Sequence, residues 1–266
     1  MLPGVYHATK KNGESYYRAS ITYGAKHISL GSYTNELSAH DAYQMACQLL
    51  SPTSEETIES YSTKKMLPFT KWVILINYRD NKIYFKNPIY IKKRYFLYYI
   101  NYETCLKFDV DDLFYYAHHK IMKRGGHLFV NDYGMQVNIS SRYGIKNYAV
   151  LGKDYNFING DCYDFRYHNI EIINSFHGVS KVLHKGQYIY LTKIHIIGDY
   201  FVGRYQTEIE AAVAYNKAAL LLKNSGLKKN FPLNFIEGLD EIAYAALFQK
   251  LRISKNLIEY AKSRII

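Results

Sequence analysis

The stretch from Val137 to Asn174 holds the residues whose types and spacing are most suited to chemistry. Its centre, residues 156–169, reads Asn-Phe-Ile-Asn-Gly-Asp-Cys-Tyr-Asp-Phe-Arg-Tyr-His-Asn, which brings amide, carboxylate, guanidinium and imidazole groups into one short segment. Hydrolysis of a phosphodiester needs a base that removes a proton from water and a divalent ion on the scissile phosphate. Elsewhere the sequence has no Walker loop, GxGxxG, HExxH or nucleophile elbow. The adjacent His118 and His119 would point about 100° apart on a helix, so they would not share a metal ion.

This segment resembles the body of an HNH nuclease finger, which usually reads Asp-His-Ile-Asp/Asn-Gly-Asn and continues with Asn-Arg and Asn-Leu. Gly160, Arg166 and Asn169 match its scaffold positions, and the preceding Ser-Arg-Tyr at 141–143 resembles the residues that lead into it. The resemblance implies a ββα module over about 137–175.

The same resemblance implies that the catalytic positions have been lost. The activating histidine is replaced by Phe157, whose phenyl ring cannot accept a proton, and the metal-binding aspartate is replaced by Asn156. Magnesium prefers carboxylate to a neutral amide oxygen, and His168 and His177 lie off the expected register. With Asn156, Phe157 and Asn169 as degenerate positions, we expect no catalytic residues, no metal and no cofactor. An active HNH endonuclease of a mobile element remains the alternative.

A second pattern occurs twice, at Gly4–Leu50 and at Gly178–Gly226. Each copy has Gly-Val, a tyrosine-rich alternating segment, a turn, Leu/Val-Gly-x-Tyr and an Ala-rich segment with one conspicuous tyrosine. Period-two alternation predicts a three-stranded antiparallel sheet with one apolar face, and so small a sheet needs a covering helix. The expected apolar stripe of the first helix, which starts near Asn35, comprises Leu37, Ala39, Ala42, Tyr43, Ala46 and Leu50. In the second copy Thr207 and Glu210 form a capping box, and the helix ends before Gly226.

These strings resemble the AP2/ERF-type DNA-binding domain. The first copy carries the matches at residues 4–5, 17–21, 30–33 and 39–43, and the second carries them at 178–179, 202–207 and 210–218, with a trailing Asn-Phe at 230–231 and again at 234–235. The resemblance implies that the outward side chains of each sheet enter a major groove and touch bases and phosphates. The implied DNA-binding residues are Tyr6, Lys10, Tyr16, Arg18, Ser20, Thr22, His27, Ser29, Ser180, His184, Leu191, Lys193, His195 and Phe201. Few of them are arginine, the commonest reader of guanine, so each copy alone should bind weakly and the linked pair more tightly.

The amino-acid composition is consistent with DNA binding and limits the other properties that can be expected of the protein. The 266 residues include 34 Lys and Arg against 23 Asp and Glu, a net charge of +11, which favours a polyanion as partner, although a merely solvated basic surface explains the charge equally well. Three scattered cysteines form no disulfide framework or zinc knuckle and indicate a reducing compartment. The longest apolar run, residues 72–76, is too short to span a membrane. We expect a cytoplasmic protein, in a bacterial nucleoid or a phage-infected cell.

The predicted organisation is an α+β protein of three modules. The modules and their connections are an AP2-like domain at 1–50, a polar linker at 51–65, a central module at 66–175, a second AP2-like domain at 176–236 and a C-terminal helix at 237–266. In the central module we expect a basic strand pair within 82–96 and a helix from Asp109 to Arg124 that ends at Gly125. The C-terminal helix either packs on the second AP2-like domain or pairs with another copy of the chain.

The function expected from the sequence is sequence-specific binding of double-stranded DNA by a transcriptional regulator descended from an HNH homing-type nuclease. Two alternatives stay open, namely the active endonuclease and a structural protein whose sheet faces meet other proteins.

Overall fold

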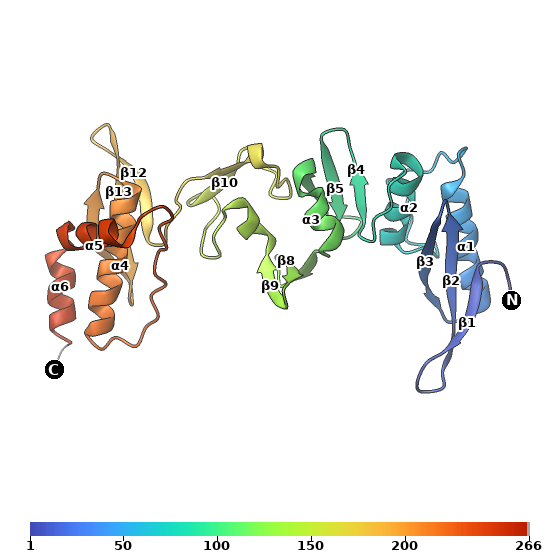
Figure 1. The fold of residues 1–266 in the computed structure, drawn as a ribbon, viewed down its shortest axis with the longest axis horizontal. Helices are drawn as coiled ribbons and strands as arrows, with labels where there is room; N and C mark the ends of the chain where they lie inside the picture. Colours follow the sequence, from blue (N-terminus) through green and yellow to red (C-terminus); the bar gives the residue numbers. More distant parts are fainter. Residues whose placement is uncertain (265–266) are drawn as a thin grey trace. The chain divides into compact units, whose positions relative to one another are not determined.

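The computed structural model describes residues 1–264, which form six α-helices and five small antiparallel sheets (Figure 1). Four sheets have three strands and one has two. The mixed α+β class predicted from the sequence is confirmed at this level. The chain divides into two compact units, the first comprising Met1–Ile139 with Asp161–Asn169, and the second comprising Ser140–Gly160 with the residues from Ile170 onward.

The first unit begins with the predicted three-stranded sheet and its helix. Strands β1 (Val5–Thr9), β2 (Ser15–Tyr23) and β3 (Lys26–Tyr33) pair in that order, and α1 (Glu36–Leu50) covers one face. The side chain of Asn35 caps the helix by accepting a hydrogen bond from the Ser38 amide at 2.7 Å. The prediction that Leu37 faces the sheet is wrong, because its side chain is 68% exposed. It precedes the buried Ala39 by two residues, which places it about 200° around the helix.

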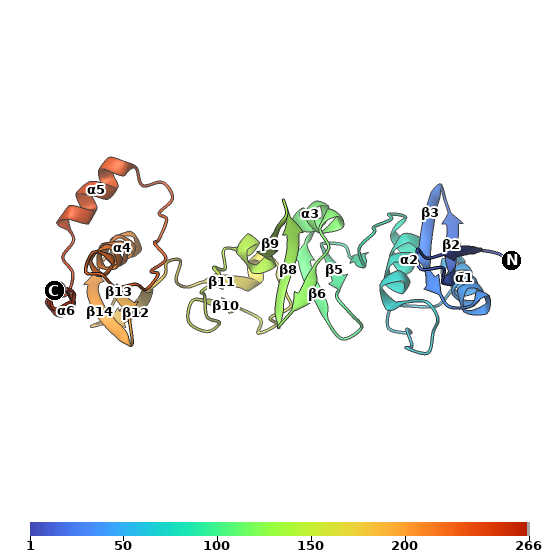
Figure 2. The same cartoon turned by 90° about the horizontal axis from the view of Figure 1, so that it is seen from below.

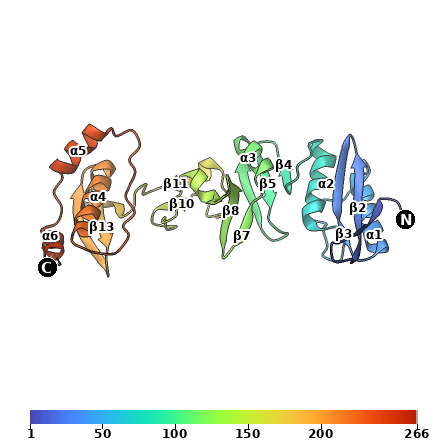
Figure 3. The same ribbon diagram turned by 60° about the horizontal axis from the view of Figure 1, so that its bottom comes forward.

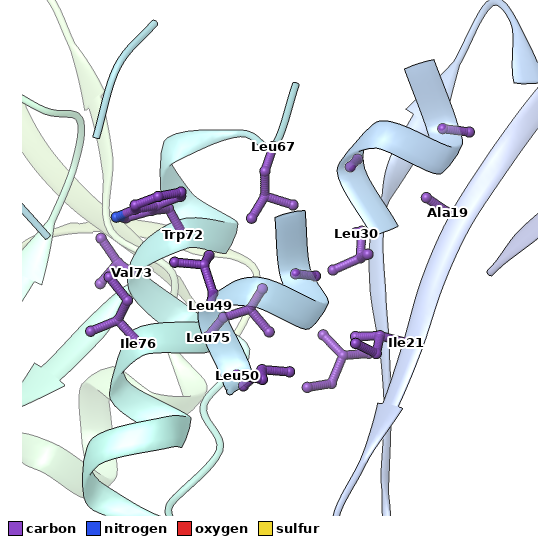
Figure 4. Packing of buried hydrophobic residues seen from close by; sticks show 14 of the residues in the cluster. Ala19, Ile21, Leu30, Leu49, Leu50, Leu67, Trp72, Val73, Leu75 and Ile76 are labelled. Carbon is purple, nitrogen blue, oxygen red and sulfur yellow. The ribbon is translucent and has the colours of Figure 1, made fainter. Parts of the chain in front are cut away.

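A helix that the sequence analysis did not assign completes the core of this unit. The apolar run 72–76 lies in α2 (Phe69–Asn81), where every one of its side chains is buried. Figure 4 shows side chains of α2 meeting Leu49, Leu50 and Leu67. The segment predicted to be a polar linker packs here as well, since Ile58 is buried and the Thr57 carbonyl accepts a hydrogen bond from the Trp72 indole at 2.9 Å.

Two further small sheets follow in the first unit. One is formed by β4 (Ile89–Ile91), β5 (Tyr95–Tyr99) and β6 (Cys105–Asp109), and the other by β7 (Met122–Arg124), β8 (His127–Asp132) and β9 (Met135–Asn138). Between the sheets lie the 3-10 turn η1 (Val110–Asp112) and the short helix α3 (Leu113–His118), and η3 (Tyr167–Asn169) joins this unit from later in the chain.

The predicted helix from Asp109 to Arg124 is therefore wrong beyond His118. His119 has an extended backbone, and Met122–Arg124 pairs with β8 as strand β7. Gly125 and Gly126 both have positive φ and connect the two strands. Two left-handed residues in succession suit the tight turn of a hairpin, so these glycines start a new strand pair and do not cap a helix.

The second unit contains a hairpin and the second repeat. After η2 (Ile139–Tyr143), the strands β10 (Tyr155–Phe157) and β11 (Ile170–Ile172) form the hairpin. The sheet of β12 (Val179–His184), β13 (Gln187–His195) and β14 (Asp199–Tyr205) is covered by α4 (Glu208–Asn224), as Figure 3 shows. The capping box of Thr207 and Glu210 is confirmed. Asn234 fastens the following segment to the sheet, because its side chain accepts from the His177 amide at 2.8 Å and donates to the His177 carbonyl at 3.1 Å.

The C-terminal region forms two helices where one was predicted. They are α5 (Glu241–Lys250) and α6 (Lys255–Lys262), and the end of the predicted helix, residues 265–266, lies outside the described residues. The break is held by the sheet, since the Val202 carbonyl accepts from the Ser254 amide at 2.7 Å and the Tyr205 hydroxyl donates to the Arg252 carbonyl at 2.8 Å.

The two repeats share one structural device. Each sheet has a bulge at the same position of its third strand, where Leu30 in the first and Val202 in the second are extra residues opposite the steps from Ala19 to Ser20 and from Thr192 to Lys193 on the central strand. On the central strand, the amide after this step donates to the carbonyl of the Gly-Val glycine, at 3.0 Å to Gly4 and at 2.8 Å to Gly178. Both glycines have positive φ, and a tyrosine ring of the covering helix lies where a Cβ would be, Tyr43 over Gly4 and Tyr215 over Gly178.

This close approach gives a matched test of the packing between sheet and helix. A Cβ at Gly178 would meet the Lys193 carbonyl oxygen and the Tyr215 ring, both at 2.5 Å, whereas one at Gly186 would meet nothing within 4 Å, although both residues have left-handed φ. Gly186→Ala should cost about 1–2 kcal/mol from the backbone conformation alone. Gly178→Ala should cost about 1–3 kcal/mol more because of the overlap. Native-state hydrogen exchange of the α4 amides measures both, and equal losses would contradict this account of the packing.

Candidate nucleic-acid interface

The face of the first sheet that points away from α1 is open and mostly polar. Strand register places Tyr6, Arg18 and Ser32 in one row across the sheet, and all three are exposed. Side chains directly opposite one another on neighbouring strands stand about 4.5–5.5 Å apart at Cβ. One cation, one phenol and one hydroxyl therefore lie within reach of a single ligand.

Toward one end of this sheet, Thr22 and His27 are exposed and face each other, with 3.2 Å between the Thr22 hydroxyl and the His27 Nδ1 atom. Ser29 is also exposed on this face. At the opposite end, Tyr16 is half-buried beside Ala8. Lys10 lies beyond β1, where its ammonium forms a 2.9 Å ion pair with Glu14 that holds the pKa of the glutamate below its usual range.

One predicted reader in the first sheet is misplaced. Ser20 is only 8% exposed, and its hydroxyl oxygen is buried. Its amide is committed to the Gly4 carbonyl. The parity of β2 is regular here, with Ala19 and Ile21 buried in the core on either side, but Ser20 lies opposite the bulge on β3 and is covered as well. The prediction that Ser20 presents its side chain to a ligand is therefore wrong for this structure.

The corresponding face of the second sheet has different chemistry. Its first row consists of Ser180, Leu191 and Arg204, of which only the arginine is fully exposed. In the next row the exposed Lys193 faces Phe201, which is 42% exposed. The Arg204 guanidinium stacks over the Phe201 ring at 5.2 Å. This arrangement presents two cations beside an aromatic surface.

The ends of the second sheet hold the remaining predicted readers. His184 is exposed opposite Gln187, and His195 is paired with Asp199 through a 2.9 Å contact from Nδ1 to the carboxylate. The His195 contact lowers the pKa of Asp199, so the aspartate stays ionised on a face that is otherwise basic.

Arg204 and Ser32 were missed by the sequence analysis, although they occupy equivalent positions next to Gly203 and Gly31. The signal was present, because each follows the glycine of the repeated Leu/Val-Gly-x-Tyr string and belongs to the outward parity of its strand. When parity along the third strand is counted from that glycine, which lies just beyond the bulge, both residues are assigned to the outward face. Counting from the start of the strand assigns them to the inner face.

In the HNH-like segment, Arg166 and Asn169 at the scaffold positions form hydrogen bonds that support the loop. Asp164 is fully buried and accepts two hydrogen bonds from the Arg166 guanidinium, with Nε at 2.8 Å. Asn169 is 1% exposed and donates its side-chain amide to the Asp164 carbonyl at 2.8 Å. Lys107 on β6 bonds to Asp161 at 2.8 Å, and this lowers the pKa of the Asp161 carboxyl. The contacts of Arg166 and Asn169 hold the loop 161–169 together, and the Lys107 contact fastens it to β6.

The expected ββα module is not formed. Asn156 and Phe157 lie half-buried on β10, and the Phe157 ring packs edge-on against Tyr155 at 5.8 Å. After β11 the described chain runs to β12 without an α-helix. The sequence from 173 to 178 instead bonds to the second repeat. The Ser175 amide donates to Glu208 of α4 at 2.8 Å, and the Asn174 side chain accepts from the Lys181 amide of β12 at 2.8 Å. Residues 1–264 contain no group of three or more His, Cys, Asp or Glu side chains arranged to hold a metal ion.

Comparison with known protein families, with curated proteins and with solved structures finds no match for this chain. None of the helices within residues 1–264 is long and apolar enough to cross a membrane.

The structural account of the finger predicts that Asn169 supports folding. Asn169→Ala leaves the buried carbonyl of Asp164 without this donor, which should cost about 1–3 kcal/mol. His168→Ala is the matched control, because its side chain is exposed at the adjacent position, and we expect a change within about 0.5 kcal/mol. Protection of the Lys107 amide against hydrogen exchange reports both effects, and an unchanged protection in Asn169→Ala would refute the role assigned to this side chain.

Proposed function

We propose that the protein binds double-stranded DNA sequence-specifically through the outward faces of its two repeated sheets, and that it acts as a transcriptional regulator. The observation that carries the proposal is the repeat itself. The same bulged sheet and covering helix occur twice, and each leaves a face open on which an arginine is exposed, Arg18 in one and Arg204 in the other. Antiparallel strands presenting outward side chains suit the width of a major groove.

The composition of the two faces supports nucleic acid over a protein partner. Exposed cations lie beside hydroxyl and imidazole groups on the first face and beside an aromatic ring on the second. Cations neutralise phosphates, while polar side chains form hydrogen bonds to base edges. The net charge of +11 adds long-range attraction. Asp199 opposes that attraction locally, and its pairing with His195 limits the cost.

Joining two faces in one chain raises the affinity that either alone would give. Once one sheet is bound, the other samples DNA at a high effective concentration, provided that both sites can be reached together. The small number of arginines on each face makes this linkage important, because each good bidentate contact contributes only about 1–3 kcal/mol of base discrimination.

The proposal assigns contact roles that substitution can test. A duplex is first obtained by random-site selection with the purified chain. Arg18→Ala and Lys193→Ala should then weaken its binding, with a loss of about 1–3 kcal/mol if the side chain reads a base. The slope of log affinity against log salt should fall by about one for each phosphate contact that is lost. Arg124→Ala and Lys262→Ala are charge-matched controls, because both side chains are exposed but lie outside the two faces.

Fluorescence anisotropy at several salt concentrations measures these effects. Failure to select any duplex, or binding that ignores salt, would count against the DNA-binding function. Equal losses in the control variants would show that charge in general, and not the two faces, is responsible.

We further propose that the protein binds DNA without cutting it. Phe157 occupies the position at which the HNH-like pattern needs a base, and a phenyl ring cannot take up a proton. Asn169 is held by the backbone of its own loop. Supercoiled plasmid incubated with the full chain and Mg²⁺ or Mn²⁺ should therefore stay supercoiled. Nicking that a chelator abolishes would instead establish the endonuclease.

A further inference from the structure

Helix α5 lies at the surface of the second unit and exposes some of its apolar residues. It is ten residues long, none of its residues is buried, and Ile242 is 84% exposed. Ala245 and Ala246 are exposed as well. Helices shorter than about 12–15 residues are marginal in water, and most helical stability in proteins comes from packing an apolar face. The outer side of α5 carries Ile242, whereas Tyr244 and Phe248 on the side toward α4 are half-buried.

Both apolar and polar contacts hold α5 beside α4, because Tyr244, Leu247 and Phe248 pack against the core cluster of the second repeat. The Asn216 side chain donates to the Tyr244 hydroxyl at 3.1 Å near the start of α5. At the other end the Lys217 ammonium bonds to the carbonyls of Phe248 at 2.7 Å and Leu251 at 2.8 Å. Figure 2 shows α5 running apart from α4, with the connecting chain looping between them. A groove lies between the two helices.

This groove is preformed, apolar and basic at its rim. It encloses a volume of about 880 Å³ between α4, the segment 227–233 and α5. Leu220 and Leu233, which are 45% and 66% exposed, contribute apolar surface. The lining includes Lys223, Lys228 and Lys229 and no acidic residue. Lys229 is committed to the Ile196 carbonyl at 2.8 Å, whereas Lys223 and Lys228 are exposed at the rim.

We propose that this groove binds an amphipathic segment of a partner protein, apolar on one side and acidic on the other. An apolar helix laid into a hydrophobic groove is a recurring mode of recognition, and the volume lies within the range of sites that enclose a ligand. The lysines select acidic side chains at the edge of that helix and discriminate against basic ones.

Charge also argues against a second copy of this chain as the occupant. Pairing groove to groove would bring the lysine rims of two copies together, and like charges across an interface oppose association. The free chain is already strongly basic, at +11. A partner of opposite sign gains from both the rim and the overall field, so the groove fits a heterologous acidic segment better than self-association.

The test uses two synthetic helical peptides and the full chain. Both peptides carry Leu at positions i, i+3, i+4 and i+7, and the remaining positions are mainly Glu in one and Lys in the other. We expect the acidic peptide to bind saturably and at least about tenfold more tightly than the basic one, a difference of about 1.4 kcal/mol. Charge reversal in Lys223→Glu with Lys228→Glu should reduce or invert this preference.

A matched pair of variants locates the site. Ala245 lines the groove and Ala246, exposed on the same helix, does not. Ala245→Arg should fill the groove and lower the affinity for the acidic peptide at least about tenfold, with Ala246→Arg near the parent value. Both should keep the parent's helical circular dichroism, which separates blocking from unfolding.

Three outcomes would overturn the proposal. They are equal affinity for the two peptides, binding that Ala245→Arg leaves unchanged, and no saturable binding of the acidic peptide. A concentration-dependent dimer in sedimentation analysis that Ala245→Arg dissociates would assign the groove to a second copy. None of these measurements involves DNA, so the result is independent of the proposed DNA-binding function.

Discussion

The contact between the Gly-Val glycine and the amide opposite the sheet bulge is the constraint on which each repeat depends. It joins the first strand to the second beside the point where the pairing of the second and third strands shifts register, and it brings the backbone so near the helix that only a glycine fits beneath the tyrosine ring. A buried amide needs a hydrogen-bond acceptor. Here the acceptor is the carbonyl of the glycine, and a side chain at that position would push the backbone away. The bulge, the glycine and the tyrosine therefore specify one another in both copies.

How much of the fold could be predicted from the sequence depended on whether the interactions were local or long-range. Alternation identified the strands of both repeats, and the capping box of Thr207 and Glu210 marked the start of the second helix, because these signals are local. Burial of Ser20 was not predictable by parity, since the bulge lies between Ser29 and Gly31 on another strand. Helix α2 was missed because its apolar run is buried nearly all round, which erases the helical period.

The candidate site was predicted in part for the same reason. Most of the outward residues were found from period two, but Arg204 and Ser32 lie beyond the bulge on the third strand, where parity counted from the start of the strand is reversed. In the central region the error had a different source. The acids of the first turn and the bases after it suggested one helix from Asp109, whereas strand pairing took over the second half of the segment. Tertiary pairing outweighed local preference there, as it did where Ser254 and Arg252 divide the C-terminal region.

The two sheets have equivalent backbones but unlike outer faces. Arg18 in one corresponds to Leu191 in the other, and His27 corresponds to Asp199. Paired identical subunits favour palindromic targets, since the symmetry of the protein is copied into the nucleic acid. Two dissimilar faces within one chain are not related by such symmetry. If duplex DNA is the ligand, the bound protein would have one defined orientation along the DNA axis. It would therefore distinguish upstream from downstream sequence without a second protein.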